Sequence, residues 1–285
     1  MNDMYKKSVM HGAALHARKT SYRSNSALIA QSKQTSGQWL SGKLRMFAGG
    51  LFMAIACSAH IVLLLILLPF RVTRLKATGL FANVAGRILM FISGCPVTVK
   101  GKEHLDRRKP AIYVANHTSA LDLLVAMWHI PVGTSGVAKK QIAYIPFFGW
   151  LYLLSGHLLI DRGNSKKAIT DMNKLGELVK QHKLSIFIWP EGTRSRDGRL
   201  KDFKKGYIHL ARQTGLPVIP FIITGTYQNW QPETHTLRKS PITVDILPPI
   251  DTSEWKLREV DSINAEVHQC FEKHLPWDQL PAETA

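Results

Sequence analysis

The feature that most constrains this chain is a run of 25 residues without a charge, MFAGGLFMAIACSAHIVLLLILLPF, at residues 46–70. A helix needs about 20 apolar residues to cross a bilayer, so the run meets the length criterion for a membrane helix. A buried core helix is the alternative that length leaves open. A cleaved signal peptide fits poorly, because the basic region before the run is too long and no clean small-residue cleavage site follows it.

The segment before this run is strongly basic. Residues 1–45 hold eight Lys or Arg against the single acid Asp3, within a chain whose formal net charge is +17. The segment is rich in Ser, Asn, Gln and Lys, so we expect a flexible tail that is attracted to anionic lipid headgroups. Nucleic acid is not the expected partner, because no aromatic residues interleave these charges as a stacking platform.

Basic residues on both sides of the run constrain its topology. Arg71, Arg74 and Lys76 follow it at once, and positive flanks favour the cytoplasmic side, which one span cannot satisfy at both ends. A second apolar stretch at 79–95 is shorter and carries an arginine. We therefore expect residues 46–95 to form a helical hairpin or re-entrant anchor in the inner (cytoplasmic) membrane, with the rest of the chain facing the cytoplasm.

The remaining residues, 96–285, alternate short apolar runs with longer amphipathic ones. Strands separated by helices predict an α/β domain with a mixed, largely parallel sheet covered by helices. In such a sheet, ligand-binding groups gather where strands end. The predicted strands are 97–100, 111–115, 136–139, 157–160, 184–189, 218–223 and 242–247, and the predicted helices are 166–182, 203–213 and 254–274.

Metal and disulfide chemistry is not indicated by the sequence. The three cysteines, Cys57, Cys95 and Cys270, are far apart and have no C-x-x-C spacing, so they suggest neither a disulfide framework nor a zinc site. No H-E-x-x-H or similar ligand spacing is present. We therefore expect no metal ion in the site.

The segment NHTSALD at residues 116–122 places a histidine five residues before an aspartate, directly after a predicted strand. In an uninterrupted helix these side chains would lie about 140° apart around the axis. His117 and Asp122 meet only if the histidine lies in the turn after the strand and the helix begins near Ser119. Asp122 would then accept one imidazole N–H and leave the other nitrogen free to take a proton. The spacing is also compatible with a capping aspartate beside an ordinary loop histidine.

A second polar segment, PEGTRS at residues 190–195, also follows a predicted strand. Its proline ends the strand, and its glycine permits an unusual backbone conformation beside Thr193, Arg194 and Ser195. A guanidinium with neighbouring hydroxyl and N–H groups is suited to gripping a phosphate. An ordinary solvated basic loop is the alternative interpretation.

Together these segments resemble the sequence blocks of the glycerolipid acyltransferases. NHTSALD looks like their N-H-x-S-x-x-D block, and PEGTRS looks like their third block. The resemblance covers roughly residues 94–270 and leaves the basic tail outside. The other similar segments are LLIDRGNSKKA (158–168) and LPVIPF (216–221), with AKKQIAYIPFFGWLYLLSG (138–156), FKKG (203–206) and ILPPI (246–250) similar to the bacterial 1-acylglycerol-3-phosphate acyltransferases.

The resemblance implies transfer of a fatty acyl group from acyl-CoA or acyl carrier protein to the 2-hydroxyl of lysophosphatidic acid, which forms phosphatidic acid in phospholipid biosynthesis. His117 would be the general base, oriented by Asp122. A thioester is already activated, so no cofactor is implied beyond the acyl donor itself. The implied partners are lysophosphatidic acid, the acyl donor and membrane phospholipids.

The resemblance also implies where the acceptor's phosphate binds. Arg194 would be the main cation, and Glu191 would orient Arg194 or hydrogen-bond the glycerol, because a carboxylate repels a phosphate. Arg162, Lys204 and Lys139 are further candidate ligands. The expected substrate-binding loop consists of Glu191, Gly192, Thr193, Arg194 and Ser195.

Several alternatives stay open on the sequence. The aromatic stretch 144–154, YIPFFGWLYLL, is compatible with an acyl-chain tunnel and equally with core or membrane contact. The acceptor could be glycerol 3-phosphate or another lysolipid. A membrane phosphoesterase would release phosphate or need a divalent metal, whereas a transferase releases free thiol. A non-catalytic lipid-binding protein would be unaffected by loss of His117.

Overall fold

Two apolar helices precede the sheet in the computed structural model, which describes residues 34–106, 108–161 and 163–282. They are α2 (Ser36–Ile66) and α3 (Arg71–Ser93), and by length and composition both are apolar enough to cross a membrane. α2 begins at Ser36 and not at 46 as predicted, because Thr35 and Gln38 form a capping box. The last residues assigned to the flexible tail are therefore helical, and residues 1–33 lie outside the described residues.

A seven-stranded sheet forms the centre of the molecule, with strand order β1-β7-β6-β2-β5-β3-β4. All neighbouring strands pair in parallel except β6 and β7, which are antiparallel. The predicted mixed, largely parallel sheet is confirmed, and each predicted strand is present. The strands are β1 (Val97–Lys100), β2 (Ile112–Ala115), β3 (Thr134–Lys139), β4 (Leu158–Ile160), β5 (Ser185–Ile188), β6 (Val218–Thr224) and β7 (Ile242–Ile246).

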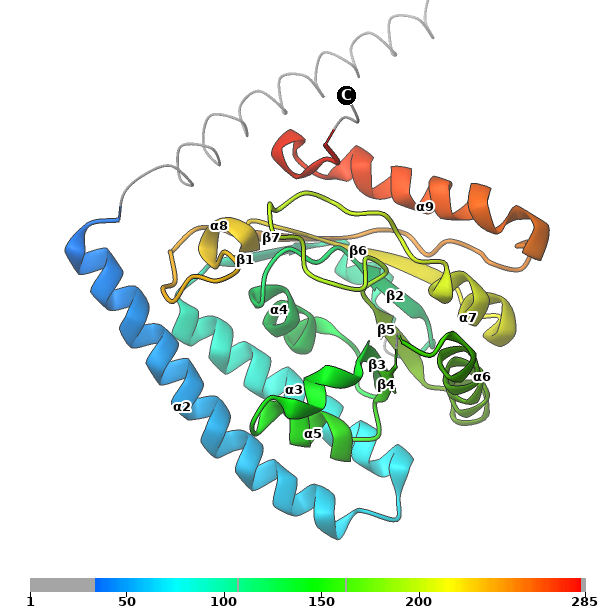
Figure 1. Ribbon diagram of the computed structural model, residues 1–285, viewed down its shortest axis with the longest axis horizontal. Helices are drawn as coiled ribbons and strands as arrows, with labels where there is room; N and C mark the ends of the chain where they lie inside the picture. Colours follow the sequence, from blue (N-terminus) through cyan, green and yellow to red (C-terminus); the bar gives the residue numbers. More distant parts are fainter. Residues whose placement is uncertain (1–33, 107, 162, 283–285) are drawn as a thin grey trace, which may run out of the picture.

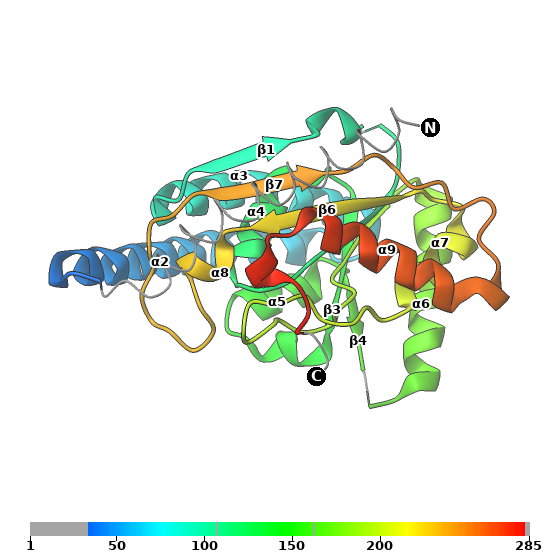
Figure 2. The ribbon, with the colours of Figure 1, turned by 90° about the horizontal axis from the view of Figure 1, so that it is seen from above.

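Helices cover both faces of this sheet (Figures 1 and 2). The three predicted helices correspond to α6, α7 and α9, although α7 begins at Gly206 and α9 at Val260, later than expected. The helices that follow α3 are α4 (Leu121–His129), α5 (Phe148–Leu154), α6 (Ser165–His182), α7 (Gly206–Thr214), α8 (Thr226–Asn229) and α9 (Val260–His274).

The central strand β2 is buried on both faces, and its alternating side chains separate two cores. Ile112 and Val114 belong to the core beneath α6, α7 and α9. Tyr113 and Ala115 belong to the opposite core, beneath α3 and α4. Figure 1 shows α4 lying between the sheet and the helical hairpin formed by α2 and α3. A strand buried on both faces reads as a continuous apolar run, which is why this one was predictable.

The hairpin packs directly against the α/β domain. Gly86 of α3 is buried, and a Cβ atom there would lie 2.7 Å from the backbone nitrogen of Trp128 and 2.8 Å from the backbone oxygen of Leu124. α3 and α4 are therefore in contact at backbone distance. The helical hairpin was predicted as a separate anchor. It instead packs against the α/β domain, through the contact between α3 and α4.

The close contact at Gly86 predicts how substitutions there change the free energy of unfolding. Gly86→Ala should lower the free energy of unfolding by about 1–3 kcal/mol, because the new Cβ meets backbone atoms that cannot rotate away. Gly50→Ala on α2 is the matched control, since no atom lies within 4 Å of its Cβ position. Alanine there should raise stability by up to about 1 kcal/mol. Denaturant unfolding in detergent measures both, and equal effects would contradict the close packing.

Candidate active site

The polar segments meet at one edge of the sheet. β2, β5 and β3 are neighbours and run in parallel, so the residues that follow them emerge on the same side. His117 follows β2, the loop containing Arg194 follows β5, and Lys139 ends β3. This is the edge at which parallel sheets collect ligand-binding groups.

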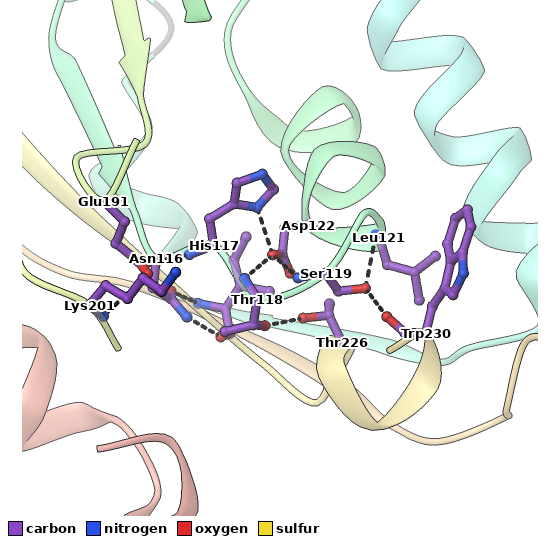
Figure 3. A network of polar contacts seen from close by, with 11 residues as sticks. Asn116, His117, Thr118, Ser119, Leu121, Asp122, Glu191, Lys201, Thr226 and Trp230 are labelled. Carbon is purple, nitrogen blue, oxygen red and sulfur yellow. Dashed lines mark hydrogen bonds and ion pairs between the residues drawn. The ribbon is translucent and has the colours of Figure 1, made fainter. Parts of the chain in front are cut away.

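His117 and Asp122 are in contact, as their spacing predicted. The Nδ1 atom of His117 lies 3.0 Å from Oδ2 of Asp122, and Figure 3 shows the ring turned toward this carboxylate. The same oxygen accepts the backbone N–H groups of Thr118 and Ser119, each at 2.7 Å. The other oxygen, Oδ1, is buried and has no hydrogen-bond partner among the described residues. Three donors on one oxygen fix the aspartate in place.

α4 begins close to the predicted position. Ala120, the residue after Ser119, is its N-cap, and Leu121 is its first residue. The Ser119 hydroxyl accepts the N–H of Leu121 at 3.2 Å and donates to the backbone oxygen of Trp230 at 2.8 Å. Asp122 lies in the first turn, and its carboxylate reaches back to the N–H groups of Thr118 and Ser119.

The histidine is held in one tautomer and one plane. Because the Asp122 oxygen is an acceptor, a neutral His117 carries its proton on Nδ1 and leaves Nε2 free to accept one. The ring stacks on Trp189, with ring centroids 4.2 Å apart and planes 20° apart. The His117 side chain keeps 16% of its area exposed and lines a cavity. This arrangement suits a general base.

The peptide groups of His117 are bound by the loop after β5. Its N–H donates to Oε1 of Glu191 at 2.6 Å, and its carbonyl oxygen accepts the N–H of Ser195 at 2.8 Å. The other Glu191 oxygen accepts the N–H of Lys201 at 3.2 Å. Glu191 is only 3% exposed, and neither of its oxygens bonds to Arg194 in the part of the chain that the structure describes. The expected orienting contact with Arg194 is therefore replaced by one with the histidine's backbone.

One residue of the site escaped the sequence reasoning. Asn116 is buried, and its side chain exchanges two hydrogen bonds of 2.8 Å with the backbone of Ile223 in β6. The Asn116 side chain thus extends the hydrogen bonding between β2 and β6 beyond the end of β2. This holds the start of the turn that carries His117 against the sheet. The partner lies 107 positions away, so no local pattern pointed to it.

The expected phosphate loop divides into two groups. Gly192, Thr193 and Arg194 line the cavity. Gly192 has φ 75°, in the left-handed region that favours glycine. The exposed Arg194 guanidinium makes no hydrogen bond or ion pair with any described residue. Ser195, in contrast, is buried and donates its hydroxyl to Asp197 at 2.7 Å, so the structure places it outside the cavity wall together with Glu191.

The three additional cationic residues differ in their position relative to the cavity. Lys139 lines the cavity. Lys204 is exposed and does not line it. Arg162 lies outside the described residues. Among the described residues, no group of three or more His, Cys, Asp or Glu could hold a metal ion.

The cavity itself is about 830 Å³ in volume. Its polar end carries His117, Arg194 and Lys139, and most of its remaining wall is apolar and comes from α2, α3, α4 and α5. The aromatic stretch predicted as a tunnel or a core segment contributes Ile145 and Phe148 to this wall. A cavity with a charged end and an apolar body suits an amphiphilic ligand.

A second histidine of the cavity has different chemistry. Burial, with a smaller contribution from the charge of Arg71, lowers the pKa of His157 to about 4. Its Nδ1 accepts the N–H of Gly136 at 3.1 Å, and no carboxylate contacts it among the described residues. His157 is therefore neutral at physiological pH and lacks the orienting acid that His117 has.

Comparison with known proteins identifies the class of this fold and site. Residues 96–224 match the family model described as Acyltransferase. The crystal structure of the 1-acyl-sn-glycerophosphate (LPA) acyltransferase from Thermotoga maritima has the same fold, with a TM-score of 0.68 over 83% of this chain and 94% of that chain at 22% identity.

Proteins with similar sequences define the class of enzyme more closely. The 1-acyl-sn-glycerol-3-phosphate acyltransferase of Limnanthes douglasii is 41% identical over 77% of this chain and 78% of its own. The enzyme of the same name from Escherichia coli is 34% identical over 70% of this chain and 80% of its own. The chain belongs to the 1-acyl-sn-glycerol-3-phosphate acyltransferase family, and the predicted enzyme class, an O-acyltransferase, is confirmed.

The buried Glu191 predicts a pH dependence of stability. Burial raises its pKa from 4.5 to about 8 against the opposing effect of its two N–H bonds, so between these values the folded state holds the proton more tightly than the unfolded state does. The free energy of unfolding should therefore fall as the pH rises from 4.5 to 8, by on the order of a few kcal/mol. Glu191→Gln cannot titrate and should lose this slope. Parallel pH profiles of unfolding for the two proteins would contradict the assignment.

Proposed function

We propose that this protein transfers a fatty acyl group from acyl-CoA or acyl carrier protein to the 2-hydroxyl of 1-acylglycerol 3-phosphate and so forms phosphatidic acid. The observation that carries the proposal is the 3.0 Å contact between His117 and Asp122 at the mouth of a cavity that also presents Arg194. A base, a free cation and an apolar wall meet the needs of a phosphorylated lipid alcohol. The printed names of the relatives support the same acceptor.

The chemistry assigned to His117 is general base catalysis. Nε2 accepts the proton of the acceptor hydroxyl as its oxygen attacks the thioester carbon. The new carbon–oxygen bond forms, the carbon–sulfur bond breaks, and the imidazolium returns the proton to the leaving thiolate. Asp122 holds the ring and stabilises its transient positive charge. The protein needs no metal or covalent acyl intermediate for this step, because the thioester is already activated.

The acceptor's phosphate is assigned to Arg194, with Lys139 as a second cation. A guanidinium free of protein partners can donate two parallel hydrogen bonds to a phosphate. Gly192 and Thr193 line the same wall. Glu191 and Ser195 serve this site indirectly, since they hold the backbone of His117.

The apolar helices support an assignment to the membrane. The hairpin presents large apolar side chains to the outside, and the same two helices contribute the apolar wall of the cavity. In this proposal the catalytic domain lies on the cytoplasmic side of the inner membrane, and the acceptor enters from the bilayer without leaving it fully. The outward apolar residues include Phe47, Leu51, Ile55, Leu80 and Phe91.

Loss of the base tests the reaction. His117→Ala should lower kcat by about 10²- to 10⁴-fold, because the cavity loses the histidine that Asp122 orients as a base. His209→Ala, at an exposed position of α7, should leave it unchanged. The measurement is thiol release from acyl-CoA with and without lysophosphatidic acid. Full turnover by His117→Ala would refute the mechanism.

Loss of the cation tests the acceptor. Arg194→Ala should raise the acceptor KM by about tenfold or more with a smaller change in kcat, because a charge-assisted bond to the phosphate is lost. Arg196→Ala is the matched control, since this neighbouring arginine is exposed and does not line the cavity. If monoacylglycerol, which lacks the phosphate, is acylated as well as lysophosphatidic acid by the parent enzyme, the acceptor is wrongly assigned.

A further inference from the structure

The charges that line the cavity are all of one sign. Three cations take part in its wall, Arg45, Lys139 and Arg194, and no Asp or Glu of the described chain does. Lys139 and Arg194 belong to the strand ends described above. Arg45 comes from α2 and lies outside residues 96–224, which match the acyltransferase family. A residue predicted to belong to the flexible tail therefore lies in α2 and contributes a charge to the cavity.

The guanidinium of Arg45 lies over the end of α3. Its Cζ atom is 3.4 Å from the position that a Cβ of Gly94 would occupy. Gly94 is the C-cap of α3 and has φ 69°, a left-handed conformation that favours glycine. The absence of a side chain at this position leaves room for the guanidinium against the backbone.

The contacts of two glycines of α3 show which end of α4 lies nearer to this arginine. Gly79 lies against Val132, beyond the end of α4, and Gly86 lies against Leu124 within it. α3 and α4 thus run in opposite directions, so Gly94 lies toward the start of α4. The histidine turn precedes this start, so Arg45 and the turn lie toward the same end of α4.

Arg45 has no protein partner in the described part of the chain, neither a hydrogen bond nor an ion pair. It also stands directly before the uncharged run at 46–70, which would place it at headgroup level if the hairpin enters a bilayer. Lys43, two residues earlier, differs: its Nζ lies 4.0 Å from the ring centroid of Trp39, and it does not line the cavity.

We propose that Arg45 binds a phosphate group of a substrate in this cavity, as an anion site additional to Arg194. The inference rests on the proposed function. In that reaction the acceptor and the donor each carry phosphate, so one cationic loop does not account for both. A cation without an acid partner in a mostly apolar wall has its charge available for an incoming phosphate.

Kinetics of Arg45→Ala and Lys43→Ala test this site, because the two variants remove the same charge from the same helix on different faces. Arg45→Ala should raise the KM of one phosphate-bearing substrate by about tenfold, with kcat changed less, and Lys43→Ala should leave both KM values at the parental level. A raised lysophosphatidic acid KM assigns the phosphate to the acceptor. A raised acyl-CoA KM that is absent with acyl-pantetheine assigns it to the donor.

Two further variants separate binding from packing. Arg45→Lys keeps the charge and should recover part of the lost affinity, whereas Arg45→Gln keeps the size without the charge and should behave like Arg45→Ala. Unchanged KM values for both substrates, or equal shifts in Arg45→Ala and Lys43→Ala, would overturn the inference. His117→Ala and Arg194→Ala separate this failure from failure of the reaction, since their effects do not depend on Arg45.

Discussion

The geometry of the site depends on how the loop after β5 holds the peptide groups of His117. The N–H of the histidine is bound by Glu191 and its carbonyl by the N–H of Ser195. These two bonds join the ends of two neighbouring strands, and the imidazole itself contacts Asp122 and stacks on Trp189. The loop that presents Arg194 is thereby fixed relative to the base. In the proposed reaction, these bonds would keep the base and the cation in a fixed relative position, as preorganised catalysis requires.

The polar groups behind the histidine are nearly all satisfied by the protein itself. Asp122 is fully buried and collects three donors on one oxygen, and Asn116 extends the ladder into β6. A buried carboxylate without such donors would be strongly destabilising. The free groups, Nε2 of His117 and the guanidinium of Arg194, face the cavity instead. The turn therefore has hydrogen-bonded groups on its buried side and unpaired groups on the side that faces the cavity.

The sequence predicted the sheet well and the contacts within the site only in part. Short apolar runs such as the one in β2 are recognisable because both faces are buried. The five-residue spacing of His117 and Asp122 allowed a contact only at a strand-to-helix turn, but it did not show that the contact forms. The partners of Glu191 and Asn116 lie 74 and 107 positions away, and such pairs depend on strand order, which no local pattern contains. The start of α2 was missed for a different reason: the capping signal at Thr35 lies within a polar segment that reads as flexible.

The helices α2 and α3 show why anchor and active site cannot be separated in this fold. Each helix has an outward apolar face and an inward face that packs on α4 or lines the cavity. The close contact at Gly86 holds α3 at backbone distance from α4, and both helices line the cavity. Because one wall is built by the hairpin and the other by the strand ends, an amphiphilic ligand meets an apolar surface and a charged one in the same enclosure. In the proposed function, the helices that place the protein at the membrane therefore also line the cavity in which the lipid would meet His117.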